Sequence, residues 1–164
     1  MIAIISDTHM PKGARTLPQA CRERLRMAER IVHAGDLNTL TVLGELRAIG
    51  PPVTAVHGNV DEAAVRAALP EAATVTLGER RIAIVHDAGP ARGRLARMRR
   101  RFPDVDAVVF GHSHIPLIET APDGSFSIVN PGSPTERRRA PAHTMALAEL
   151  DGAGALRFTI VTVD

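Results

Sequence analysis

Short apolar runs alternate with longer amphipathic segments along the first two thirds of the chain. The runs are rich in Val, Ile and Ala and have the length of buried strands, whereas the longer segments carry apolar residues at helical spacing. We therefore expect strands at residues 1–6, 31–33, 53–57, 74–77, 81–85 and 107–110. Helices are expected at residues 17–30, 38–49, 62–69 and 91–101, and the second of these stops at Gly50-Pro51-Pro52.

The last third of the chain has a different pattern, in which pairs of β-runs flank a turn sequence. Residues 117–120 and 126–129 flank Pro122-Asp123-Gly124-Ser125, and residues 144–150 and 156–163 flank Asp151-Gly152-Ala153-Gly154. Both arrangements are typical of β-hairpins. Strand–helix alternation followed by hairpins predicts an α/β fold with two packed mixed β-sheets flanked by helices, a four-layer α-β-β-α sandwich. No linker interrupts the chain, so we expect residues 1–164 to form one domain.

Cysteine content and hydropathy bear on the compartment. The single cysteine, Cys21, excludes an internal disulfide and gives no sign of an oxidising environment. The first residues are typical of a strand rather than of a signal peptide, and no apolar run approaches the roughly 20 residues of a membrane helix. We therefore expect a cytoplasmic protein with no membrane partner. The sequence does not indicate its oligomeric state.

The charge pattern bears on possible partners. The formal net charge is +2, and Arg residues cluster between positions 97 and 101 and between positions 137 and 139. These clusters are either solvated surface or a means of attracting anionic substrates. With four Phe and no Trp or Tyr, the chain lacks a stacking platform for single-stranded nucleic acid. The charge permits a nucleic-acid partner, and hence a nuclease, but no motif supports one.

Five predicted strands are each followed by a polar residue that can bind a metal. Each apolar run is followed by Asp, Asn or His, and the leading residue is Asp7, Asp36, Asn59, His86 or His112. These residues are 29, 23, 27 and 26 positions apart, which is about one strand–helix unit each. Because the carboxyl ends of parallel strands face a common crevice, we expect the five groups to meet.

The side chains brought together in this way form a set of metal donors. The set contains two carboxylates, one amide oxygen and four imidazoles: Asp7, His9, Asp36, Asn59, His86, His112 and His114. In an extended chain His9 lies on the same side as Asp7, and His114 on the same side as His112. Burying these polar groups without a partner would cost free energy, which a bound metal ion would offset. Seven donors are too many for one ion but suit two ions that share a carboxylate. Mixed imidazole and carboxylate ligands favour Mn, Fe or Zn, with Ni as a further possibility.

The order of these motifs is similar to a known signature. Asp7-x-His9, Gly35-Asp36, Gly58-Asn59-x-Asp61, His86 and Gly111-His112-x-His114 resemble the calcineurin-like metallophosphoesterases. The compact length, together with Asn130-Pro131-Gly132-Ser133 and the following Arg residues, resembles the small bacterial and archaeal phosphodiesterase branch of that superfamily.

The resemblance implies a mechanism and a role for each donor. It implies one metal site from Asp7, His9, Asp36 and His114, and a second from Asp36, Asn59, His86 and His112. Asp36 would bridge two divalent ions, expected to be Mn²⁺, and a metal-bridging hydroxide would attack the phosphorus of a small phosphoester. It places Asp36, Asn59 and His112 as catalytic residues of a hydrolase for phosphodiester or activated phosphomonoester bonds. The alternative within the same family is a non-catalytic interaction scaffold, of which the retromer subunit is the precedent.

Two positions depart from the family pattern. The position after Asn59 is Val60, where many members carry a His that protonates the leaving oxygen. The branch often has His-Gly-His after the fifth strand, whereas this chain has His86-Asp87-Ala88, and Asp87 is unexplained. If another residue protonates the leaving oxygen, His57 and Asp87 are the first candidates.

Other polar residues near the motifs have simpler interpretations. His33 and His57 are expected to pack or to support the ligands, and Asp61 is expected to cap the following helix. Asn130 and Ser133 either orient substrate or shape a turn. The loop from Gly89 to Arg94 is expected to be ordinary, with anion binding as the alternative.

Overall fold

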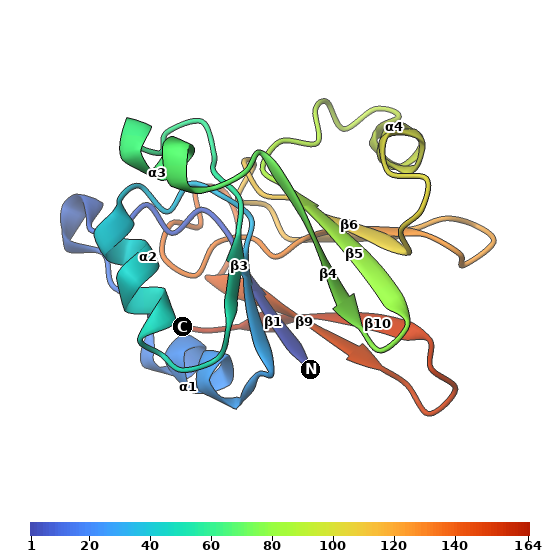
Figure 1. Ribbon diagram of the computed structural model, residues 1–164, viewed down its shortest axis with the longest axis horizontal. Helices are drawn as coiled ribbons and strands as arrows, with labels where there is room; N and C mark the ends of the chain where they lie inside the picture. The colour runs from blue at the N-terminus through green and yellow to red at the C-terminus, as the bar shows by residue number, and fades with distance from the viewer.

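The computed structural model describes residues 1–164, which form two five-stranded β-sheets with helices outside them (Figure 1). The first sheet contains β1 (Ile2–Ile5), β2 (Arg30–His33), β3 (Val53–Ala55), β9 (Thr144–Leu150) and β10 (Leu156–Thr162). The second contains β4 (Ala72–Leu77), β5 (Arg80–Val85), β6 (Ala107–Val109), β7 (Leu117–Thr120) and β8 (Ser127–Asn130). The helices are α1 (Gln19–Met27), α2 (Leu40–Arg47), α3 (Ala63–Ala68) and α4 (Arg94–Arg101), with one 3-10 turn, η1 (Lys12–Ala14).

Both sheets are mixed, and each has a parallel centre. The first has the order β10-β9-β1-β2-β3, in which β1, β2 and β3 run parallel. The second has the order β4-β5-β6-β8-β7, in which β5, β6 and β8 run parallel. The antiparallel pairs β7–β8 and β9–β10 are the two hairpins that the turn sequences predict. The expected α/β fold of two packed sheets with flanking helices is confirmed.

Strand β1 is apolar throughout because both of its faces are covered. Ile2 and Ile4 lie in the core between the two sheets, whereas Ala3 and Ile5 lie in a second core beneath α1 and α2. A third core packs Met98 of α4 against the outer face of the second sheet. A central strand that is covered on both faces cannot alternate apolar and polar residues. Figure 1 shows α1 and α2 beside the first sheet and α4 beside the second.

Element boundaries differ from the expected ones by a few residues. The first helix ends at Met27 instead of residue 30, because Arg30 already pairs with Ile2 at the start of β2. The fourth helix begins at Arg94 instead of residue 91, and residues 91–93 form a turn before it. None of the helices combines the length and the hydropathy that crossing a bilayer requires.

Cys21 lies on the buried face of α1 and has no exposed surface. Burial raises the pKa of its thiol to about 12, so the reactive thiolate is absent at neutral pH. We expect no alkylation of the folded protein by iodoacetamide at pH 8 and complete alkylation in guanidinium chloride. Mass spectrometry of both samples checks this, and labelling of the folded protein at the rate of the unfolded one would contradict the burial.

Candidate metal centre

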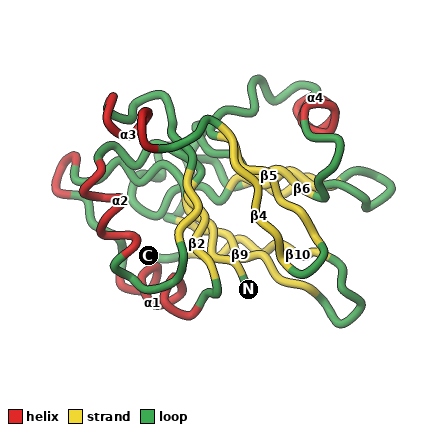
Figure 2. The backbone as a smooth tube through the Cα atoms, viewed as in Figure 1, coloured by secondary structure: helices red, strands yellow, loops and turns green.

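The predicted donors come together at the edge where the carboxyl ends of both sets of parallel strands meet. The first sheet supplies Asp7 and His9 after β1, Asp36 after β2 and Asn59 after β3, and the second sheet supplies the remaining three His residues after β5 and β6. All seven lie in loops rather than in regular elements, and Figure 2 distinguishes these loops from the strands that carry them. Both sheets therefore contribute to the site.

The backbone at five of the seven donors is left-handed. Asp7, His9, Asp36, His112 and His114 have φ between 46° and 68°, a region that residues with a side chain rarely adopt. The expectation that His9 and His114 follow extended backbone is therefore wrong. The chain turns sharply at these five donors because the loop must direct each side chain across the edge of the sheet. Strained φ values of this kind gather at functional sites.

Three donors form a first cluster, which is buried. The Nε2 atoms of His9 and His114 are 3.1 Å apart, and His114 Nε2 lies 3.4 Å from Asp7 Oδ1. His114 Nδ1 donates to the backbone carbonyl of Glu136 at 2.5 Å. Because a carbonyl can only accept, the proton is on Nδ1 and the lone pair of Nε2 faces the cluster. That lone pair meets a second imidazole nitrogen and a carboxylate, an arrangement that a cation between them would stabilise.

The other four donors form a second cluster around Asp36. His86 Nε2 lies 3.2 Å from Asp36 Oδ2 and 3.0 Å from Asn59 Oδ1, and His112 Nδ1 lies 3.0 Å from the same amide oxygen. His86 Nδ1 donates to the carbonyl of Ala34 at 2.8 Å, so its Nε2 faces these oxygens. Asp36 Oδ2 is also 3.8 Å from His9 Nε2, which places Asp36 between the two clusters.

The ionisation of these groups reflects a crowded, buried site. Burial raises the pKa of Asp7 to about 7, and the nearby Asp36 carboxylate adds to the rise. Burial lowers the pKa of His9, and it lowers that of His114 to about 4, so both imidazoles are neutral and able to bind a metal. Burial opposes the charged form of His86 as well, but Asp36 and Asp7 outweigh it and raise its pKa to about 8.

This donor set fits divalent metal. Asp7, His9 and His114 approach one another within the range of a shared ion, and so do Asp7, Asp36 and His86. Neutral imidazoles beside carboxylates are the ligands of Mn, Fe and Zn. The hydrogen bonds of His86 and His114 to backbone carbonyls place a proton on Nδ1 and leave Nε2 as the atom that would bind a metal, as in metal-binding histidines.

Gly58 and Gly111 are required because atoms of other loops lie directly against their backbone. A Cβ at Gly58 would lie 2.0 Å from Asp36 Oδ1 and 2.5 Å from the Asp36 nitrogen. A Cβ at Gly111 would lie 1.9 Å from Ser6 Oγ and 2.6 Å from Asp7 Oδ2. Each glycine therefore lets a donor from another strand pack against its backbone, which explains why Gly precedes Asn59 and His112 in the sequence.

Asp61 does not cap the following helix, contrary to expectation. The residue before α3 is Glu62, and no side chain caps that helix. The buried Asp61 carboxylate instead accepts hydrogen bonds from three backbone nitrogens, those of Asp36 at 3.1 Å, Asn38 at 2.6 Å and Gly58 at 2.6 Å. It therefore ties the loop that carries Asp36 to the loop that carries Asn59.

The remaining polar residues support loops. His33 is buried, receives the Gly35 N–H on Nδ1 at 3.2 Å and contacts the Thr8 hydroxyl, and burial lowers its pKa to about 4. Asn130 Nδ2 donates to the carbonyl of Gly111, and Ser133 Oγ donates to that of Asp7. Both hold the donor loops in place, which favours their structural interpretation.

Glu136 is a residue that the sequence pattern did not indicate. Its carbonyl accepts from His114, its Oε2 lies 4.0 Å from His9 Nε2, and it forms an ion pair with Arg15 at 3.4 Å. Its only signal in the sequence is its place three residues after Ser133, the last residue of Asn130-Pro131-Gly132-Ser133.

Most arginines of α4 serve the structure. Arg94 and Arg97 donate to backbone carbonyls of the loop from Ala88 to Arg92. Arg99 pairs with Asp123 and Arg101 with Glu71. These contacts explain the Arg-rich sequence without a nucleic-acid partner, and the loop from Gly89 to Arg94 is held by the arginines around it.

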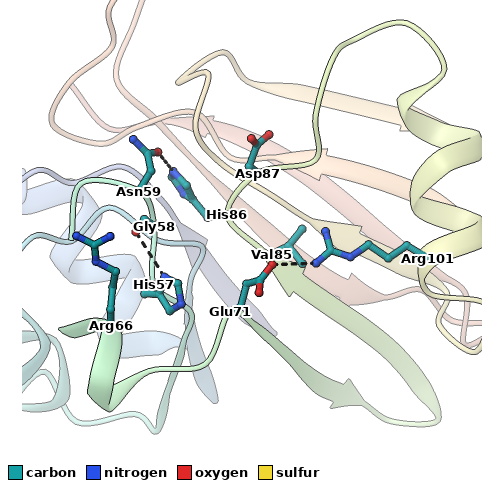
Figure 3. Close-up of a pocket in the computed structure, with 9 residues that line it drawn as sticks. All are labelled: His57, Gly58, Asn59, Arg66, Glu71, Val85, His86, Asp87 and Arg101. Atoms are coloured by element: carbon teal, nitrogen blue, oxygen red, sulfur yellow. Dashed lines mark hydrogen bonds and ion pairs between the residues drawn. The ribbon is translucent and has the colours of Figure 1, made fainter. Parts of the chain in front are cut away.

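Two open clefts border the donors. The small cleft, of about 240 Å³, is lined by His57, Gly58, Asn59, Arg66, Glu71, Val85, His86, Asp87 and Arg101 (Figure 3). The large cleft, of about 520 Å³, is lined by His9, Pro11, Lys12, Asn38, Thr39, Val60, Glu62, Glu136 and Arg138. The donors Asn59 and His86 belong to the first and His9 to the second, so the clusters lie between the two clefts.

Comparisons with known proteins agree with this geometry. Residues 1–153 match the model of the calcineurin-like phosphoesterase superfamily domain. A probable metallophosphoesterase of Methanothermobacter thermautotrophicus is 33% identical over 154 residues, which cover 93% of this chain and 87% of the relative. A second, from Methanocaldococcus jannaschii, is 32% identical over 84% of this chain and 70% of its own length. The structure of wild-type Vps29 from Entamoeba histolytica, complexed with Zn²⁺, has 23% identity, covers 99% of both chains and superposes with a TM-score of 0.75, which shows a common fold.

Proposed function

The chain belongs to the calcineurin-like phosphoesterase superfamily, and from this we propose that it hydrolyses small phosphoesters with two divalent metal ions. The observation that carries the proposal is the convergence of the Nε2 atoms of His86 and His114 on carboxylate oxygens, while the Nδ1 atom of each donates to a backbone carbonyl. Such an arrangement is unfavourable unless a proton or a cation lies between the groups. Every donor position of the family pattern is filled in this chain, which supports a catalytic member.

The two clusters would hold one ion each. Asp7, His9, Asp36 and His114 would hold the first, and Asp36, Asn59, His86 and His112 the second, with Asp36 shared. Two such ions, when bound, supply an activated water and neutralise charge on the phosphoryl oxygens. The ligand chemistry supports Mn²⁺, Fe or Zn²⁺, and we propose Mn²⁺ as the activating ion.

The residues around the clusters provide the rest of the site. His112 is exposed at the rim and contacts Asn59, so it can reach a phosphoryl oxygen of a bound ester. The exposed Arg138 donates to the carbonyl of His112 and lines the large cleft, where its charge attracts an anionic ester. The clefts on either side support a phosphodiester as substrate, because each can receive one ester arm while the phosphate lies at the donors.

The test of this function combines metal analysis with a substrate panel. We expect two Mn²⁺ ions per chain at saturation, hydrolysis of aryl phosphodiesters, and loss of that activity on treatment with a chelator, restored best by Mn²⁺. Metal content is measured by mass spectrometry after removal of free ions. One ion or none at saturating Mn²⁺ would overturn the two-metal proposal.

The second candidate function is a binding scaffold, supported by the fold shared with Vps29. A scaffold needs an apolar interface, but the exposed large apolar residues are spread over separate elements: Met27, Leu40, Val60, Ile115, Ile118 and Leu150. Isolated apolar residues of this kind are normal on a monomer. A protein that binds two ions but hydrolyses no ester of the panel would favour the scaffold.

A further inference from the structure

The small cleft contains a cation that the rest of the molecule does not use. Arg66, on α3, forms one wall of the cleft, and its side chain makes no hydrogen bond or ion pair with any other lining residue (Figure 3). The second cation, Arg101, reaches in from α4 on the opposite side. Arg101 is already paired with Glu71 at 3.4 Å, and its guanidinium carbon lies 5.2 Å from the centroid of the Phe102 ring. Arg66 is therefore the cation that remains available.

The lining of the small cleft restricts what it can bind. Val85 is its only apolar residue, so the cleft offers no surface for an acyl chain. Glu71, Asp87 and the carbonyl of Gly58 provide acceptors for hydroxyl groups. A polar group with several hydroxyls and one negative charge matches this lining.

The position of the cleft relates it to the donors. Asn59 and His86 form its inner end, and both belong to the second donor cluster. A phosphodiester whose phosphate lies at that cluster can therefore extend one arm towards Arg66. The cleft opens at the seam between the two sheets, with Arg66 and His57 on the side of the first sheet and Val85 and Arg101 on the side of the second.

From these observations we propose that Arg66 selects phosphodiesters with one arm that is a small anionic polyol, such as a glycerol phosphate or a sugar phosphate. This inference rests on the proposed function and specifies its substrate class. Arg66 binds the terminal anion of that arm, and the acceptors of the cleft bind its hydroxyl groups. The other arm extends over the large cleft, on the side of Val60.

The kinetic test uses two chromogenic diesters that differ in one group. These are the 4-nitrophenyl phosphodiester of glycerol and that of glycerol 3-phosphate, assayed with the Mn²⁺-loaded protein. A charge-assisted hydrogen bond at a partly open site changes affinity by about tenfold, so we expect a KM about tenfold lower for the phosphorylated ester. R66Q should remove this preference and leave hydrolysis of the glycerol ester within about twofold of the original.

Two matched variants control for net charge. R100Q removes an exposed Arg of α4 that does not line the cleft, and R101Q removes the Arg already paired with Glu71. Both should keep most of the preference. Equal KM values for the two esters in the original protein, or a preference that survives R66Q, would overturn the assignment of Arg66.

A binding measurement separates this inference from the proposed function. Calorimetric titration of the Mn²⁺-loaded protein with glycerol 3-phosphate and with glycerol 1,3-bisphosphate needs no turnover. We expect the bisphosphate to bind about tenfold more tightly, and R66Q to make the two equal. Absence of hydrolysis with this binding pattern would overturn the proposed function alone, whereas hydrolysis without the pattern would overturn the role of Arg66 alone.

Discussion

Asp36→Asn is expected to lower kcat/KM for an aryl phosphodiester by at least about 10³-fold, because it weakens the one carboxylate shared by both proposed metal sites. Metal-assisted charge stabilisation is worth several kcal/mol, which corresponds to a factor of this size. The side chain keeps its shape, and Oδ1 can still accept from the Val60 N–H, which it now meets at 3.0 Å. The loss should therefore appear in metal content and rate rather than in the fold. Steady-state kinetics and metal analysis of the purified variant measure both effects.

Asp61→Asn is the matched comparison, since it changes the same chemical group one loop away. Asn has a single acceptor oxygen, whereas the Asp61 carboxylate accepts three backbone N–H groups. At least one buried donor then loses its partner at a cost of about 1–3 kcal/mol, which lowers Tm by several degrees. Activity should fall by only about 10–100-fold, as is usual for groups that orient metal ligands. If Asp61→Asn lowered kcat more than Asp36→Asn did, the roles of the two residues would be wrong.

The sequence was sufficient to predict the architecture and the convergence of the candidate donors. Apolar runs such as Ile2 to Ile5, each followed by an acid, amide or imidazole, located the central strands and the donors at their ends. The turn sequences at Pro122 and Asp151 located both hairpins. These features depend on local spacing and turn chemistry, which a single sequence records directly.

The sequence was insufficient where a role depends on contacts between distant segments. Asp61 precedes a helix and resembles a cap, but it bonds to the loop of Asp36, 25 residues away. Glu136 meets His114 through a backbone carbonyl, which no side-chain pattern records. The small cleft lies between two sheets, so nothing in the sequence near Arg66 shows that Arg101 faces it across the gap.

Hydrolysis should slow steeply as the pKa of the leaving group rises, because Val60 occupies the position of the usual family acid. Val60 is 48% exposed and lines the large cleft together with His9, where we expect the leaving oxygen to depart. A positioned acid typically contributes about 10²–10⁴-fold, and its benefit is greatest for poor leaving groups. Nitrophenolate leaves as an anion without help, whereas an alkoxide does not. We therefore expect aryl diesters to be cleaved at least about 10²-fold faster than alkyl esters.

The measurement is kcat/KM for a series of aryl and alkyl esters with Mn²⁺. A flat dependence on leaving-group pKa would mean that the protein contains an acid after all. His57 and Asp87 are the first residues to substitute in that case, and both line the small cleft. Substitution of the residue that acts as the acid should then restore the steep dependence of kcat/KM on leaving-group pKa.

Val60→His provides the converse test. The backbone N–H of residue 60 already bonds to Asp36, so the loop is fixed and the new imidazole enters the large cleft from a defined point. It should raise the rates of poor leaving groups by up to about 10²-fold and leave nitrophenyl esters nearly unchanged, which flattens the slope. Val60→Gln, similar in polarity but unable to donate a catalytic proton, should leave the slope as it is. An unchanged slope in both variants would show that the leaving oxygen departs elsewhere than over the large cleft, and that the two ester arms occupy the clefts in the reverse order.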